Sequence, residues 1–251
     1  LGCNLIEDVT SLSNLHDPYK GDATRLLEDI CPFTVIGTFN RCITESNRKA
    51  IARELAAFLG VSEAVPDSFE GIPVLNNQKS WFFSNAANRQ PQDIDLLWDV
   101  FAAADRFVAS DSTESRTAFQ QAYDRALAVR GVKWNLSIGL YWCHPWEFPT
   151  LDKQSRNYIV NRLNQPIRTS GTSPCDAAGY LDLMDLLETR FKEPTYPVHA
   201  YPELSLEAWK FRDADADDIG DVDDETDAGK GDTAPETVTI GPTMTPYTIE
   251  S

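Results

Sequence analysis

No stretch of the chain stays apolar for the roughly 20 residues that a membrane-spanning helix needs. The start of the chain also lacks the charged and then apolar pattern of a secretory signal peptide. These two absences predict a cytoplasmic protein with no membrane partner. Because the first residue is Leu1 rather than Met, we expect the natural start of the protein to lie upstream.

Cysteine and histidine are scarce, with five and three in the chain. The five cysteines form an odd set without a C-x-x-C pair, which favours reduced thiols over disulfides or a structural zinc site. Cys143 and His144 are adjacent, but neighbours on an extended strand point to opposite faces, so they do not easily share one site. Of the three hypotheses for function that this subsection considers, an independent enzyme that uses Cys143 or His144 is therefore the weakest. We expect no metal site and no catalytic residue in this chain.

Two motifs of nucleic-acid enzymes are also missing. A phosphate-binding loop needs G-x-x-x-x-G-K-[ST], and the one Gly-Lys pair, Gly229-Lys230, is followed by another glycine. None of the eight lysines has Asp or Glu two positions before it, which excludes the (D/E)-x-K triplet of metal-dependent restriction nucleases. By itself the chain is neither a P-loop hydrolase nor a nuclease of that type.

Basic residues are few, since 22 Lys and Arg face 39 Asp and Glu, for a net charge of −17. Twelve of these acids and one lysine lie in residues 213–251, which leaves 27 acids and 21 bases in residues 1–212. The body is thus only mildly acidic, and a local basic face is compatible with it. The tail is too polar to offset its chain entropy, so we expect a disordered acidic linker.

Apolar periodicity predicts an α+β fold dominated by helices. Thr44 and Gly60 suit the two caps of the clearest helix. In residues 134–142 the large apolar residues alternate strictly with other residues, which predicts a half-buried strand. The apolar run "CPFTVIGTF" suits a buried strand or a tight turn. Helices are expected at about residues 23–30, 44–60, from 93 onward, 114–130, 152–163 and 173–191.

The stretch "GIPVLNNQKSWFF", residues 71–83, predicts a β-hairpin near residues 72–83. Asn tolerates positive φ, so the Asn-Asn pair suits a two-residue turn between two runs of strand composition. The same amides match base edges, and the neighbouring aromatics match base faces. Aromatic residues that are candidates for a stacking platform are Trp81, Phe82, Phe83, Trp134, Trp142, Trp146 and Phe148.

Several strings occur together and in a fixed order: "PFTVIGTFNRCITESNRKAIARELAAFL", "VPDSFEGIPVLNNQKSWFF", "DIDLLWDVFAAA", "WNLSIGLYWCHPWEFPTLDKQSRNYI" and the terminal "YTIES". Together they resemble the N-terminal portion of McrB-type proteins, the AAA+ GTPases or ATPases of modification-dependent restriction systems. The resemblance covers about residues 31–165 and the last few residues. It implies that the motor module follows Ser251, so that this chain is a fragment without the nucleotide-binding motifs.

The resemblance also implies partners and cofactors for the whole protein. These are DNA, whether or not it is modified, a separate nuclease subunit, a homo-oligomeric ring formed through the motor, and ATP or GTP with Mg²⁺ bound by that motor. Together with the composition, it divides the chain into a weakly ordered lead-in (1–30), a McrB-like N-terminal domain (31–165), a helical extension (166–212) and the acidic linker (213–251).

The leading hypothesis is therefore a DNA-binding target-recognition region without a catalytic centre. The alternative is a protein-interaction region that positions the motor ring or senses a phage component. Basic residues around the helix at 44–60 are candidates for phosphate contacts, and the hairpin residues are candidates for base or backbone contacts. The candidate DNA-binding residues are Arg41, Arg48, Lys49, Arg53, Asn76, Asn77, Gln78, Lys79 and Trp146.

Overall fold

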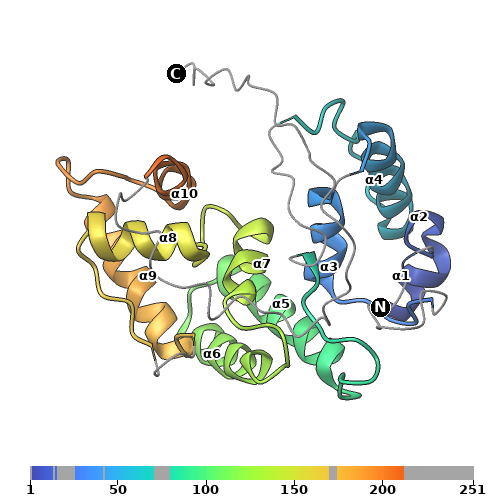
Figure 1. Ribbon diagram of the computed structural model, residues 1–251, viewed down its shortest axis with the longest axis horizontal. Helices are drawn as coiled ribbons and strands as arrows, with labels where there is room; N and C mark the ends of the chain where they lie inside the picture. Colours follow the sequence, from blue (N-terminus) through green and yellow to red (C-terminus); the bar gives the residue numbers. More distant parts are fainter. Residues whose placement is uncertain are drawn as a thin grey trace, which may run out of the picture.

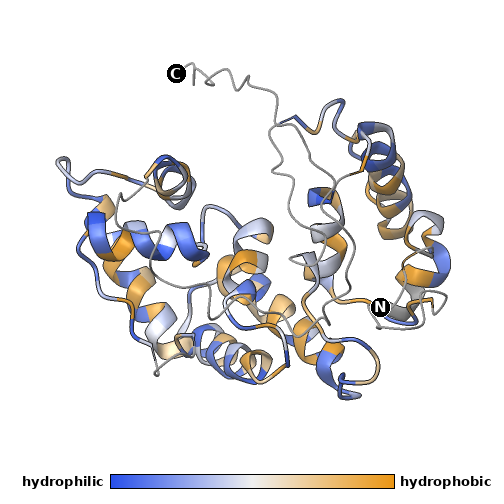
Figure 2. Cartoon of the chain, viewed as in Figure 1, coloured by the Kyte–Doolittle hydropathy of each residue, from blue (hydrophilic) through white to orange (hydrophobic). Residues whose placement is uncertain are grey.

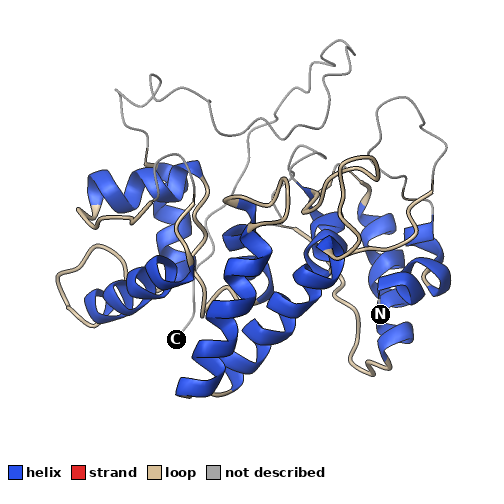
Figure 3. Ribbon diagram, turned by 90° about the horizontal axis from the view of Figure 1, so that it is seen from below, coloured by secondary structure: helices blue, strands red, loops and turns tan. Residues whose placement is uncertain are grey.

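The computed structural model describes residues 2–13, 15, 26–41, 43–70, 80–169 and 174–211, and within them every regular element is helical (Figure 3). The predicted α+β class is therefore wrong for this part of the chain, which contains no β-strand. Among the described helices, none is long and apolar enough to cross a membrane. The elements are α1 (Gly2–Asp8), α2 (Thr10–Ser13), α3 (Pro32–Gly37), η1 (Thr38–Asn40), α4 (Glu45–Leu59), α5 (Asp93–Ala109), α6 (Thr113–Leu127), α7 (Asn135–Cys143), α8 (Lys153–Asn157), η3 (Tyr158–Arg162), α9 (Ala177–Phe191) and α10 (Tyr201–Lys210).

The helices form three neighbouring groups along the molecule (Figure 1). Helices α1 and α2 pack on α4 at one end, and α8, α9 and α10 lie at the other. Between them, α3 packs against α5 and α7, and α6 connects α5 to α9. Hydrophobic and hydrophilic residues alternate along α4, α6 and α9, which is the pattern of half-buried helices (Figure 2).

Helix α4 begins and ends where its sequence predicts. The Thr44 side chain accepts a hydrogen bond from the Asn47 backbone N–H, and Gly60 adopts the left-handed conformation with φ of 68°. Residues 2–13, assigned by the sequence to the weakly ordered lead-in, form α1 and α2. The Ser11 backbone N–H and hydroxyl both donate to the Glu54 carboxylate, at 2.7 and 2.9 Å, which fastens α2 to α4. Residues 26–30 are not helical, contrary to the helix predicted for 23–30, whose first three residues lie outside the described part.

Residues 135–143 form helix α7, so the strand predicted near residues 134–142 is wrong. No residue of α7 is fully exposed, because the helix runs through the centre of the molecule. Its buried residues are Leu136, Ser137, Gly139 and Leu140, whose spacing is that of one helical face. The small residues Ser137 and Gly139 lie on this buried face, between larger neighbours. Side-chain size therefore alternates along the sequence as it does in a strand, although the backbone is helical.

The run "CPFTVIGTF" also forms a helix rather than a strand or a tight turn. Cys31 caps α3, since its sulfur accepts from the Thr34 backbone N–H at 3.4 Å, and Pro32 occupies the first turn, where no N–H is needed. Part of the predicted hairpin, residues 72–79, lies outside the described residues. Its second half is not a strand over residues 80–83, which follow an irregular path across α3.

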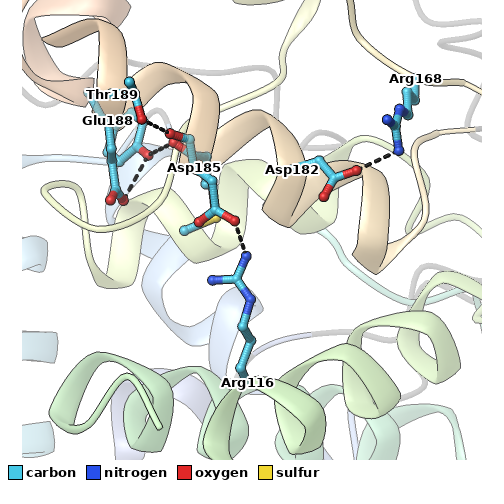
Figure 4. A network of polar contacts seen from close by, with 8 residues as sticks. Arg116, Arg168, Asp182, Asp185, Glu188 and Thr189 are labelled. Carbon is cyan, nitrogen blue, oxygen red and sulfur yellow. Dashed lines mark hydrogen bonds and ion pairs between the residues drawn. The ribbon is translucent and has the colours of Figure 1, made fainter. Parts of the chain in front are cut away.

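Polar contacts fasten α9 to its neighbours. Arg116 of α6 pairs with Asp185, and Arg168 pairs with Asp182 one helical turn earlier (Figure 4). The start of α9 is held from α6 as well, because Asp124 accepts a hydrogen bond from the Ala177 backbone N–H at 2.8 Å. These links accompany the packing of α9, whose buried residues Tyr180, Leu183 and Leu187 belong to the common hydrophobic core.

Candidate nucleic-acid interface

Two arginines and two aromatic rings lie in contact beside α3 and η1. The Arg41 guanidinium lies over the Trp81 ring, 4.6 Å from its centroid. The Trp81 and Phe83 rings meet edge to face with centroids 5.5 Å apart. The Arg89 guanidinium lies over Phe83 at 5.1 Å. We call these four residues the arginine–aromatic strip.

Tertiary contacts explain how the strip forms. Residues 81–83 form neither a helix nor a strand, and the orientation of each ring is set by its tertiary contacts. Phe82 points into the core, where its ring meets Phe33 at 5.4 Å and Trp142 at 5.8 Å. Its backbone N–H donates to the Thr34 hydroxyl at 3.3 Å. Beside the anchored Phe82, the Trp81 and Phe83 rings contact each other, and Phe83 is only 4% exposed.

Arg41 is 8% exposed and has an incomplete set of partners. Its Nε donates to the Ser80 hydroxyl at 2.8 Å, whereas its buried Nη2 has no hydrogen-bond partner. Burial lowers the pKa of the Arg41 guanidinium to about 10, so the group is still charged at neutral pH. A charged donor with an unsatisfied N–H is costly to bury unless an acceptor completes it.

The remaining predicted basic residues have different roles. Arg48 donates to the backbone carbonyl oxygens of Phe39 at 2.7 Å and Arg41 at 3.1 Å, and so fastens η1 to α4. Lys49 pairs with Glu45 at 2.9 Å along α4. Arg53 is exposed on α4. Of the four bases predicted around this helix, Arg41 is the one that lies in the strip.

The far end of the strip includes an arginine that the sequence pattern did not indicate. Arg89 donates to the Ser84 carbonyl oxygen at 3.2 Å, and the Ser84 hydroxyl donates to the Arg130 carbonyl oxygen at 3.0 Å. Arg130 in turn donates to the Asn88 side chain at 3.0 Å. Arg89 and Arg130 are 41 positions apart in the printed sequence, and no local motif joins them.

The other predicted contacts do not join the strip. Asn76, Asn77, Gln78 and Lys79 lie outside the described residues. Trp146 is 68% exposed in the turn after α7. Three of the aromatic candidates lie in the core: Phe82 and Phe148 are fully buried, and Phe83 is 4% exposed.

The three thiols that the structure describes are buried or half-buried. Burial raises the pKa of both Cys31 and Cys143 to about 12, and that of Cys175 to about 11. Thiols with such pKa values stay protonated at neutral pH and are poor nucleophiles. Cys143 ends α7 and His144 follows as its C-terminal cap. In the described ranges no group of three His, Cys, Asp or Glu side chains is arranged to hold a metal ion.

Comparison with known proteins identifies one family. The model for a domain of unknown function, DUF8425, matches residues 2–211. This match spans most of the 251 residues, so the chain belongs to that family. No curated protein and no solved structure matches the chain.

Proposed function

We propose that this member of the DUF8425 family is the N-terminal target-recognition region of a McrB-like AAA+ restriction NTPase, and that it binds DNA through the arginine–aromatic strip. The observation that carries the proposal is the contact series Arg41, Trp81, Phe83 and Arg89. Arginines bind phosphate oxygens, and aromatic rings stack on bases that leave the helix stack. Both groups occur here in one short strip.

The acidic composition of the chain seems at odds with DNA binding, but the strip supplies positive charge locally. DNA binding needs a local concentration of positive charge, and the net charge of the whole chain does not decide it. Among the described residues, neither Arg41 nor Arg48 forms an ion pair with a carboxylate. The positive charges of these two guanidinium groups near η1 are therefore not cancelled by an ion pair.

The ordered sequence strings support the McrB-like part of the proposal. In this proposal, ATP or GTP with Mg²⁺ belongs to a motor module outside the chain, which also forms the homo-oligomeric ring. A separate nuclease subunit cuts the DNA, and the whole system works in the cytoplasm. This chain contributes recognition and no catalytic residue.

One observation favours the alternative, a protein-interaction region that positions the ring or senses a phage component. Leu206 and Trp209 lie three residues apart on α10 and are 53% and 71% exposed. Exposed aromatic residues are enriched at protein interfaces. Substitutions in the strip and on this face of α10 therefore distinguish the two proposed functions.

Binding of labelled DNA at several salt concentrations tests the proposal. The chain of residues 1–251 is titrated with duplex and with single-stranded DNA at about 50 to 200 mM salt, a range in which phosphate contacts weaken strongly. Two arginine contacts predict a slope of log K against log salt of about −1.8 on duplex DNA. No binding at the lowest salt concentration contradicts the DNA-binding proposal and leaves the protein-interaction function.

A pair of charge-matched variants locates the contact. Arg89→Gln removes one positive charge from the strip and is expected to weaken DNA binding. Arg125→Gln removes the same charge from an exposed pair with Asp99, 3.3 Å away on α5, and is expected to leave binding unchanged. Equal losses in both variants contradict the assignment to the strip.

A further inference from the structure

A further pairing of an arginine with an aromatic ring lies outside the arginine–aromatic strip. The Arg156 guanidinium of α8 lies over the Trp134 ring, 4.1 Å from its centroid. Trp134 immediately precedes α7, and Arg156 also donates to the Leu151 carbonyl oxygen at 2.8 Å. These contacts hold the start of α8 beside the start of α7.

The turn between α6 and α7, residues 128–134, connects this pair to the strip. At the Arg89 end of the strip, the Ser84 hydroxyl donates to the Arg130 carbonyl oxygen, and the Arg130 side chain donates to Asn88. Lys133 follows in the same turn, directly before Trp134. The surface therefore continues from Arg89 through Arg130 and Lys133 to α8.

Basic residues outnumber acids along this path. Residues 80–92 and 128–157 contain five Lys and Arg and two Asp and Glu, whereas residues 1–212 as a whole contain 21 and 27. Of the two acids, Glu147 lies beyond the opposite end of α7. The other, Asp152, accepts hydrogen bonds from the Gln154 and Ser155 backbone N–H groups as the cap of α8. The path is thus a locally basic part of an acidic chain.

Two of the bases occupy positions that local folding does not favour for lysine. Lys133 has a φ of 40°, a backbone conformation that is uncommon for residues other than glycine. Lys153 is the first residue of α8, where the helix dipole disfavours a positive charge. Both side chains are exposed, as is Arg130. An anionic partner on the outside of the molecule would offset both local costs.

We propose that Arg130, Lys133 and Lys153 form a second DNA-contact surface, continuous with the strip, that binds phosphates of the DNA backbone. We call these three residues the turn surface. The inference rests on the proposed function, which supplies the DNA. Phosphates follow one another along a DNA strand, so a strand bound at the strip brings further phosphates to a neighbouring line of exposed bases.

The salt dependence of binding measures the number of phosphate contacts. The two arginines of the strip alone predict a slope of log K against log salt of about −1.8 on duplex DNA, and three further contacts steepen it to about −4.5. Labelled poly-glutamate is titrated in parallel as a polyanion without phosphate. Tighter binding of poly-glutamate than of DNA overturns the proposal.

Two lysine variants of the full chain locate the extra contacts. Lys133→Gln and Lys153→Gln are each expected to weaken duplex binding about 3- to 10-fold at about 100 mM salt, and to flatten the slope by about 0.9. Lys210→Gln is the matched control, because it removes the same charge from an exposed pair with Glu207 on α10 and is expected to leave binding unchanged. Thermal unfolding checks that each variant is folded.

The outcomes separate this inference from the proposed function. A slope near −1.8 with unchanged affinity in both lysine variants overturns the turn surface and leaves DNA binding by the strip. Weaker binding in the lysine variants but not in Arg89→Gln supports the turn surface and contradicts the assignment to the strip. Equal losses in Lys210→Gln overturn the turn surface, and a wild-type chain that does not bind DNA overturns both.

Discussion

Gly139 of α7 lies directly against the Phe33 ring of α3. A Cβ atom at position 139 would lie 2.7 Å from Phe33 Cδ1 and 2.9 Å from Phe82 Cε1. Phe82, whose ring also contacts Phe33, lies between Trp81 and Phe83 in the chain, and those two rings contact each other. The close approach of α7 to α3 therefore sets the position of the arginine–aromatic strip.

We expect Gly139→Ala to destabilise the protein by about 1 to 3 kcal/mol, because the new methyl group overlaps two aromatic rings. An alanine at an ordinary helical site would instead stabilise the helix by about 0.5 to 1 kcal/mol. Urea unfolding measures the difference. A Gly139→Ala variant as stable as the wild type contradicts the close contact between α3 and α7.

We expect Asp152→Ala to cost about 1 to 2 kcal/mol, because its carboxylate caps α8. One oxygen accepts from the Gln154 and Ser155 backbone N–H groups, at 2.9 and 3.1 Å. Urea unfolding of Asp111→Ala is the matched control, since Asp111 is an exposed acid in the loop before α6. Equal stability of the two variants contradicts the capping role.

We expect Trp81→Ala to weaken DNA binding by about 5- to 150-fold, the loss of one base-stacking partner. Trp209→Ala removes an exposed ring from α10, outside the strip, and leaves DNA affinity unchanged if the strip is the interface. Fluorescence anisotropy with labelled DNA measures both, and circular dichroism checks that each variant is folded. Loss of affinity in Trp209→Ala alone places the interface on α10.

Stability is expected to fall as the pH rises above 9. The pKa of Cys143 is raised from 9.0 to about 12 in the folded chain, so between these values the unfolded chain loses its proton first. The folded state then binds more protons, and the free energy of unfolding decreases with pH. Urea unfolding under reducing conditions at pH 7.5, 8.5 and 9.5 measures the decrease.

Cys143→Ala is the control for the alkaline effect. Without this thiol the fall in unfolding free energy with pH is expected to be shallower, although Cys31 and Cys175 still contribute in the same direction. A decrease of the same slope in the variant contradicts the contribution of Cys143.

Part of the candidate site followed from local sequence. Arg41 was identified as a basic residue near α4, and Trp81 and Phe83 as a run of candidate stacking residues. Arg89 was not identified, because its contact with Phe83 depends on the turn between them and no periodic pattern marks it. The local sequence also did not predict that Arg48 donates a hydrogen bond to a backbone carbonyl oxygen of η1.

The sequence by itself determined the helix signals that depend on neighbouring residues. Thr44 and Gly60 define α4 because capping involves atoms only a few positions apart. The tertiary structure decided that residues 135–143 form a helix and that the Arg41 guanidinium lies over the Trp81 ring. In α7 the inward face needs small residues where α3 approaches, so packing between distant segments produced an alternation that local rules assign to a strand.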